Sequence, residues 1–596
     1  MTLRTKIYHC AIMMAFLFVI SAGLSTTFAQ APDPGTPGPL AVTREEYDFG
    51  DTAFQPTNFP GPVELRASIH SPTNLAGGPF PVIVFLHGRH VTCFVGAGAD
   101  FLEWPCKAPR QPIPSYKGYD YVSEVLASHG YVVVSISANG VSAADNGTAD
   151  FGTLARAELI QKHLDILNTF NTTGGAPFGT KFVGKLDLSR VGTMGHSRGG
   201  EGVVRHYILN NSLGAPYGIK AVFPLAPGDF NRFVANNVAL NVLLPYCDGD
   251  VVDLQGVHYY DDARYNVPGD QAPKHYVLVM GANHDFYNTI WSVSSPFPGG
   301  DDDWFTHVPA GISDSHCGNV RGNQRLTEAQ QRGTGLAYMS AFFRAYVGGE
   351  SQFIPILTGD APPPPSAQTT NLFVSYHAPD NPQLRLDVNR LLNNTNLTVN
   401  TLGAAATQTA LSPYELCGGE APQPPRCLEQ TRLRQPHTAP SLRSPKRGLS
   451  QLKTGWNDLT GNYKNELPPA LEDVSGFQAV QFRVSVNYDD VRNPAGVPQN
   501  FRVVLTDASG SSASVRVSDV SSALFYPPGS VRSIRDLSSG AALGPVPRLV
   551  LNTVRIPLSA FGGVDLKTIR SVQFTFNEQA QGGIVITDVA FASAPQ

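Results

Sequence analysis

The chain has 596 residues, of which 42% are hydrophobic and 15% are charged, and its formal net charge at pH 7 is −5. A single hydrophobic core does not grow to this length, so we expect two or three domains. The charge balance gives no basic field that would attract nucleic acid, and the sequence has no phosphate-binding glycine loop with its lysine.

The first residues have the pattern of an export signal. Arg4 and Lys6 precede an apolar run from Ala11 to Leu24, and small residues lead to Ala29. The run is short for a membrane span, so we predict a signal peptide at 1–29, with a membrane anchor as the alternative. The mature chain is then secreted or periplasmic and has no membrane span.

Cysteine usage agrees with export. Seven cysteines occur, and Cys10 lies in the predicted signal peptide. An even number remains, which in an exported chain suggests disulfides. Among the connectivities that six cysteines permit, we predict the local ones: Cys93–Cys106, Cys247–Cys317 and Cys417–Cys427.

Residues 36–350 alternate between strand and helix patterns. Short runs rich in Val, Ile and Leu fit strands that are buried on both faces of a parallel sheet. The runs are Pro81–Leu86, Tyr131–Ser137, Val191–Met194, Ala221–Leu225, Val242–Leu244 and Tyr276–Met280. Amphipathic stretches lie between them, and a last one covers Leu336–Tyr346. The pattern predicts an α/β domain.

The composition then changes. Residues 351–370 form a Pro-rich linker, in which Pro362–Pro365 is expected to be stiff and extended. Residues 371–596 show strands of period two, as in Val480–Val486, which predicts an antiparallel β-sandwich with an irregular insertion at about 415–450. Trp456 and Tyr463 precede the clear strands and are either ligand contacts or core residues.

The strongest chemical signal is Gly195-His196-Ser197-Arg198-Gly199-Gly200. It follows a predicted strand and precedes a helical pattern, which is the context of a G-x-S-x-G nucleophile elbow. The small neighbours permit the sharp turn that presents the serine hydroxyl. We therefore predict Ser197 as the nucleophile of a serine hydrolase.

A serine hydroxyl needs a neighbouring base to become a good nucleophile. His284 follows the predicted strand Tyr276–Met280, in the loop position and chain order in which this fold presents its histidine. We predict His284 as the base. His316 is the main alternative and His307 a weaker one.

The third member should orient the imidazole. Tyr246–Asp253 follows a predicted strand and contains three aspartates. Asp250 has the usual position, a few residues past the strand, so we predict Asp250, with Asp248 and Asp253 as open alternatives. The oxyanion donors should be the backbone N–H groups of Arg89, after Leu86-His87-Gly88, and of Arg198.

We predict no cofactor and no metal. Asp301, Asp302 and Asp303 are suited to a hard cation such as Ca²⁺, but an acidic run of this kind is more often a solvated turn.

These blocks support a comparison with known families. The stretch Gly78–Gly349 resembles α/β-hydrolases of the chlorophyllase and platelet-activating-factor acetylhydrolase type, through Pro81–Gly88, Leu126–Val133 and Gly195–Gly200. The resemblance implies an α/β-hydrolase sheet flanked by helices, Ser197 as nucleophile, His284 as base, and hydrolysis of carboxylic esters. It covers about half of the chain, and the second domain and the extra cysteines depart from the family.

The C-terminal region is weakly similar to the jelly-roll carbohydrate-binding modules of secreted hydrolases, through Ile556–Phe561 and Ile584–Val589. This similarity implies a carbohydrate or polymer surface as its partner, against a purely structural sandwich. The function expected for the whole chain is a secreted serine esterase acting on an ester substrate. A lipase, polyester depolymerase or peptidase on the same triad is the alternative, as is a non-catalytic surface-binding protein.

Overall fold

The structure is a computed structural model. It describes residues 31–595 apart from 97, 308–313, 315, 319–323, 393–395, 420–426, 429–434, 445, 447, 530–533, 536–541 and 544–546. The predicted signal peptide therefore lies outside the described residues. Among the helices that the structure does describe, none is long and apolar enough to cross a membrane.

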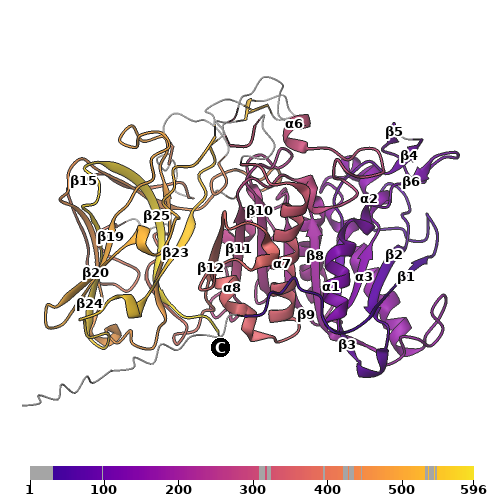
Figure 1. Cartoon of the computed structure of the whole chain (residues 1–596), viewed down its shortest axis with the longest axis horizontal. Helices are drawn as coiled ribbons and strands as arrows, with labels where there is room; N and C mark the ends of the chain where they lie inside the picture. Colours follow the sequence, from indigo (N-terminus) through magenta and orange to yellow (C-terminus); the bar gives the residue numbers. More distant parts are fainter. Residues whose placement is uncertain are drawn as a thin grey trace, which may run out of the picture. The chain divides into compact units, whose positions relative to one another are not determined.

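A nine-stranded sheet organises the first part of the chain, in the order β1-β2-β7-β3-β8-β9-β10-β11-β12 (Figure 1). The six central strands are parallel, and β1, β2 and β12 are antiparallel to their neighbours. The strands are β1 (Val42–Asp48), β2 (Arg66–Pro72), β3 (Phe80–Leu86), β7 (Val132–Ile136), β8 (Leu186–His196), β9 (Ile219–Leu225), β10 (Ala239–Pro245), β11 (Lys274–Val279) and β12 (Leu372–His377). Each of the six predicted apolar runs overlaps one of the parallel strands, because a strand buried on both faces is apolar throughout.

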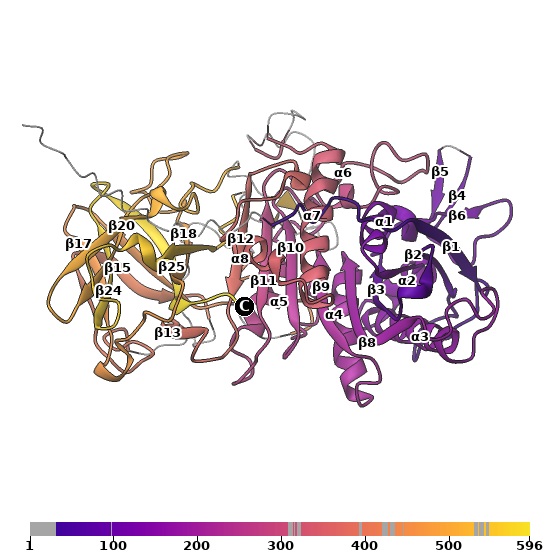
Figure 2. The ribbon, with the colours of Figure 1, turned by 60° about the horizontal axis from the view of Figure 1, so that its bottom comes forward.

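Helices cover both faces of this sheet (Figure 2). The side chains of β3 show the two faces, since Val82 and Val84 belong to one core with Leu159 and Leu164, whereas the Phe85 ring lies 6.3 Å from that of Phe343. The helices are α1 (Asp120–Ser128), α2 (Asn139–Ala144), α3 (Thr153–Thr172), α4 (Arg198–Ser212), α5 (His258–Ala263), α6 (Asp303–His307), α7 (Glu328–Tyr346) and α8 (Ile354–Thr358). A small sheet of β4 (Cys93–Val95), β5 (Ala99–Phe101) and β6 (Gln111–Pro112) lies between β3 and α1 in the chain.

The nine-stranded sheet continues past the expected linker. Part of 351–370 is helical, in α8 and in two short 3-10 turns. Within the stretch that was expected to be extended, Pro364 has an extended backbone and Pro365 begins a 3-10 turn. Strand β12 then pairs with β11 as an antiparallel edge strand, although it lies in the segment that the sequence assigned to the sandwich. The chain therefore passes from the first domain to the second after residue 377.

The second part of the chain contains two antiparallel sheets. Strands β15-β16-β25-β18-β23, with β13 beside β25, form one, and β14-β17-β24-β19-β20 form the other. Both sheets contribute to one core: the ring centroids of Phe482 in β18 and Phe574 in β24 lie 5.1 Å apart. The strands are β13 (Arg385–Asn389), β14 (Ala406–Thr409), β15 (Leu411–Cys417), β16 (Gln451–Trp456), β17 (Gly461–Glu466), β18 (Ala479–Val486), β19 (Arg502–Asp507), β20 (Ser512–Arg516), β23 (Asn552–Pro557), β24 (Ile569–Phe576) and β25 (Gly582–Ala592); β21 (Ile534–Arg535) and β22 (Ala542–Leu543) form a separate pair.

Two details of the sandwich answer questions that the sequence left open. Trp456 and Tyr463 are core residues, because each is at most 1% exposed and stacks on a phenylalanine, Phe576 and Phe574 respectively. Strand β18 is buried on both faces: its apolar side chains fill the core, and on the other face Gln481 donates to the carbonyl of Tyr376 in β12 at 2.7 Å. There, Arg483 binds Asp261 of α5 at 2.9 Å.

Candidate active site

Ser197 lies in a strained turn between β8 and α4. Its φ of 58° and ψ of −128° are unusual for a residue with a side chain and cost on the order of 1–3 kcal/mol. The turn is held by the Ser197 N–H, which donates to the carbonyl of Leu225 at 2.9 Å, and by the Gly200 N–H, which donates to the Ser197 carbonyl at 2.8 Å. This is the strand–turn–helix geometry of a nucleophile elbow.

Two glycines make room for this turn. A Cβ at Gly195 would lie 1.9 Å from the carbonyl oxygen of Gly199, so no side chain is possible there. A Cβ at Gly88 would lie 2.5 Å from the Cβ of Ser197 and 3.2 Å from its hydroxyl oxygen. The loop after β3, which carries Arg89, therefore passes directly beside the serine.

His284 follows β11 and binds a carboxylate from the loop after β10. Its Nδ1 lies 2.9 Å from Oδ2 of Asp248, and the two residues are 3% and 1% exposed. The other oxygen of Asp248 accepts hydrogen bonds from the backbone N–H groups of Asp250 and Val251, at 2.9 and 2.6 Å. The carboxylate is thus fixed to its own loop as well as to the imidazole.

The residue that the sequence favoured, Asp250, has a different position. Its Oδ2 lies 3.5 Å from Nε2 of His284, and its side chain is 48% exposed. Asp253 accepts a hydrogen bond from the Gln255 N–H at 3.3 Å, farther along the loop. An orienting carboxylate must bind Nδ1, because Nε2 has to face the serine. That contact belongs to Asp248, one of the alternatives left open.

The electrostatics of the pair favour a charged imidazole. Burial disfavours the imidazolium, but the charge and hydrogen bond of Asp248, helped by Asp250 and Asp303, outweigh it and raise the pKa of His284 to about 10. A base in this environment is stabilised once it has taken a proton.

His196, the variable position of the serine motif, supports the histidine loop. Its Nε2 lies 3.0 Å from the carbonyl oxygen of His284, and its Nδ1 lies 3.0 Å from the hydroxyl of Tyr119. Burial, together with the charge of His284, holds the pKa of His196 well below its usual range. A neutral His196 therefore donates from Nε2 and accepts at Nδ1. No role was predicted for this residue from the sequence.

Asp303 connects the loops of the acid and the base. One carboxylate oxygen accepts from the His284 N–H at 3.0 Å, and the other accepts from the Gly249 N–H at 2.6 Å. Burial and the nearby Asp248 raise the pKa of Asp303 to about 7. Asp302 binds Arg325 at 2.6 Å. The two aspartates are 0% and 3% exposed, so the solvated acidic turn expected for this stretch is wrong for them.

The loops that carry the two predicted oxyanion donors share one buried carboxylate. Oδ1 of Asp145 pairs with Arg89 at 3.1 Å and with Arg198 at 2.9 Å, and its Oδ2 pairs with Arg156 at 2.8 Å. His87, which follows β3, accepts from the Ala138 N–H at 2.8 Å and so donates from Nδ1 to the Gly88 carbonyl at 2.8 Å. No motif marks Asp145 in the sequence.

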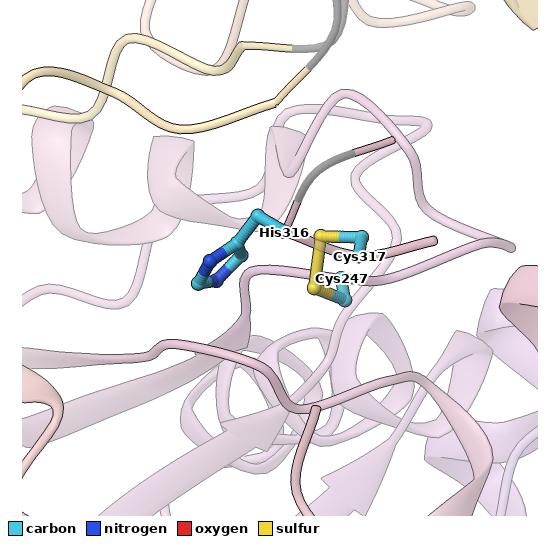
Figure 3. Close-up of side chains that lie close together, drawn as sticks. All are labelled: Cys247, His316 and Cys317. Atoms are coloured by element: carbon cyan, nitrogen blue, oxygen red, sulfur yellow. A yellow bond between two sulfur atoms is a disulfide. The ribbon is translucent and has the colours of Figure 1, made fainter. Parts of the chain in front are cut away.

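All three predicted disulfides are present. Figure 3 shows Cys247–Cys317, which joins the residue before Asp248 to the one after His316. The sulfurs and the His316 imidazole lie within 4.8 Å of one another, but sulfurs bonded to each other are not thiolate metal ligands. His316 binds Gln324 through Nδ1, whereas Asp248 binds His284. The side chain of His307 lies outside the described residues.

One comparison with known proteins bears on this site. Residues 114–295 match the model of a family described as PET hydrolase-like. No curated protein matches the chain. The matched family differs from the one that the motifs resemble, and the matched segment is less than half of the chain. It contains Ser197, Asp248 and His284, and it supports an α/β-hydrolase that acts on ester bonds.

Proposed function

We propose that the protein is an exported serine esterase with Ser197 as nucleophile, His284 as base and Asp248 as the orienting carboxylate. The hydroxyl of Ser197 attacks the ester carbonyl while Nε2 of His284 takes its proton. The tetrahedral oxyanion is met by the N–H groups of Arg89 and Arg198. His284 then gives the proton to the leaving alkoxide, and water releases the acid from the acyl-enzyme by the same steps.

The observation that carries this proposal is the buried hydrogen bond between Nδ1 of His284 and Asp248, and the elbow conformation of Ser197 supports it. Asp248 selects the tautomer in which Nε2 is free to accept a proton. The residues around the site hold the segments that carry the proposed reacting groups: His196 and Asp303 bind the backbone of His284, and Asp145 binds the side chains of Arg89 and Arg198. A scaffold without catalysis has no need of this support.

For the substrate we propose a polyester or an aromatic ester. The matched family model, described as PET hydrolase-like, supports this choice over a lipid or a peptide. A panel of p-nitrophenyl esters of increasing acyl length, run beside a polyester film and peptide amides, tests it. Release of soluble acid from the film, with no cleavage of the amides, is the expected result.

The mechanism is tested with Ser197→Ala, His284→Ala and the double variant. Each single change should lower turnover by several orders of magnitude, on the scale of about 10⁶-fold, and the double variant should lose little more, because the residues act as a unit. His316→Ala is the matched control and should keep its turnover. Folded Ser197→Ala protein with substantial esterase activity would exclude the serine mechanism.

A further inference from the structure

An arginine from the second domain binds the loop that carries Asp248. Arg548 precedes β23 and is 3% exposed. Its guanidinium donates to three carbonyl oxygens of this loop, those of Tyr246, Asp248 at 3.0 Å and Val252 at 2.5 Å. Its backbone N–H also donates to the hydroxyl of Tyr246 at 3.2 Å. The three carbonyls lie before, at and after the aspartate.

The surroundings hold the guanidinium in place. It lies over the rings of Tyr246 and Trp304, at 5.6 and 5.4 Å from their centroids. The Tyr246 hydroxyl donates to the carbonyl of Pro528 at 2.8 Å, so a second segment of the C-terminal domain contacts the same loop. A planar group with five donors is suited to several carbonyls at fixed angles, and a lysine cannot reproduce this.

From these contacts we infer that Arg548 is a positioning residue for the esterase reaction and that the sandwich domain completes the active site. The inference rests on the proposed function. Arg548 fixes the backbone on both sides of Asp248, and the Asp248 carboxylate is bound to that same backbone through the N–H groups of Asp250 and Val251. A shift of the loop therefore becomes a shift of the carboxylate against Nδ1 of His284. Misplacement of a catalytic group by about 1 Å can cost about 10²-fold in rate.

The test compares two arginines that join the domains, in the full chain. Arg548→Met keeps an apolar stem and removes the hydrogen-bond donors. Arg548→Lys keeps the positive charge but lacks the planar guanidinium with its five donors. The matched control is Arg555, which donates to Asp360 from Nε and from a terminal nitrogen, at 2.9 and 3.0 Å. Among the residues that the structure describes, none of the contacts of Arg555 reaches the loop that carries Asp248. Arg555→Met and Arg555→Lys change the interface but not the acid loop.

With p-nitrophenyl acetate as the probe, Arg548→Met should lower kcat by on the order of 100-fold with little change in KM. Arg548→Lys should fall between that variant and the wild type. The acidic limb of the kcat profile should move to lower pH in the Arg548 variants, because His284 loses part of its contact with Asp248. The Arg555 variants should keep the wild-type kcat and the wild-type pH position of the acidic limb. A purely structural arginine would lower the unfolding temperature and leave the limb in place.

Backbone hydrogen exchange gives a readout that does not depend on activity. Peptides that cover residues 246–253 should exchange faster in Arg548→Met, or in Arg548→Lys if the first variant does not fold, and at the wild-type rate in Arg555→Met. A folded Arg548 variant with kcat within about twofold of the wild type and unchanged exchange would overturn the inference. If the wild type cleaved no ester, the proposed function would fail, and exchange alone would still decide whether Arg548 fixes the loop.

Discussion

Two carboxylates flank the His284 imidazole, and they differ in burial and in the nitrogen that they contact. Asp248 is buried at Nδ1, and Asp250 is half-exposed near Nε2. We expect Asp248→Asn to lower kcat by about 10⁴-fold, because an amide does not select the required tautomer. Asp250→Asn and Asp253→Asn are the matched controls and should lose far less. A larger loss in Asp250→Asn would return the role to the residue that the sequence favoured.

The pH profile reports the same residues. His284 acts as a base only when neutral, so kcat/KM should rise as pH increases through its pKa in the free enzyme. Because Asp248, with Asp250, raises the pKa of His284 to about 10, the limb should lie above the ordinary histidine value of about 6.5. Asp250→Asn removes one of these negative charges and should move the limb to lower pH. Steady-state kinetics across the neutral and alkaline range decides this, and a limb that stays in place in Asp250→Asn would contradict it.

At the residue scale, the sequence predicts which kinds of residue form the site better than it predicts which residues contact one another. The elbow conformation of Ser197 could be predicted because its glycine neighbours are a local steric requirement. The choice among three aspartates in one loop could not, because it depends on the path of the loop. That path is set by Arg548, about 300 positions away, and by Asp303. No local pattern contains those contacts.

At the scale of elements, loops from separate strands are joined at the carboxyl edge of the sheet. Asp303 bridges the loops after β10 and β11, and Cys247–Cys317 ties the first of these to a later segment. The disulfide closes a separation of 70 residues, whereas Cys417–Cys427 closes 10. Loop-closure entropy makes the longer closure the more stabilising one.

We therefore expect the double variant Cys247→Ser, Cys317→Ser to lose about 4 kcal/mol of unfolding free energy and much of its esterase activity. Cys417→Ser, Cys427→Ser is the matched control and should lose less stability and keep its activity, since that bridge lies within the sandwich domain. Urea unfolding and p-nitrophenyl ester kinetics measure the two effects. Full activity in the first variant would show that the acid loop does not need this bridge.

Strands and helices of the hydrolase domain could be predicted because their burial is visible in composition and period. Strand β12 could not, since it lies beyond a Pro-rich stretch, and the edge position depends on pairing with β11. In β18 a period of two, which is typical of a strand with one solvated face, occurs in a strand that is buried on both faces. Arg483 is 1% exposed there, because the hydrolase domain covers it.

At the scale of the whole described chain, the hydrolase and sandwich domains share buried contacts. Val550, from the segment before β23, belongs to the same core as the hydrolase strands. A buried network joins Asp261 and Arg264 of the hydrolase domain to Arg483 and Asp588 of the sandwich domain. His437, from the insertion, binds Asp261 at 2.6 Å. These contacts differ from those of a module on a flexible tether, which would leave its neighbour's face solvated.

We therefore expect the two domains to unfold in one transition. Arg483→Met leaves Asp261 and Asp588 with one cation fewer in a buried site, and breaking a buried pair in this way costs about 3–5 kcal/mol. The variant should lower the urea midpoints of both domains equally. The kcat of the folded enzyme should stay near the wild-type value, because none of the described contacts of Arg483 reaches the loops that carry Asp248 and His284.

Two readouts follow the domains separately during urea unfolding. The loss of esterase activity reports unfolding of the hydrolase domain, and hydrogen exchange of peptides that contain Trp456 reports unfolding of the sandwich domain. Arg516→Met, at a partly exposed pair with Glu578 inside the sandwich, is the control and should shift neither midpoint appreciably. Separate transitions in the wild type, or a shift of the sandwich alone in Arg483→Met, would show that the domains fold independently.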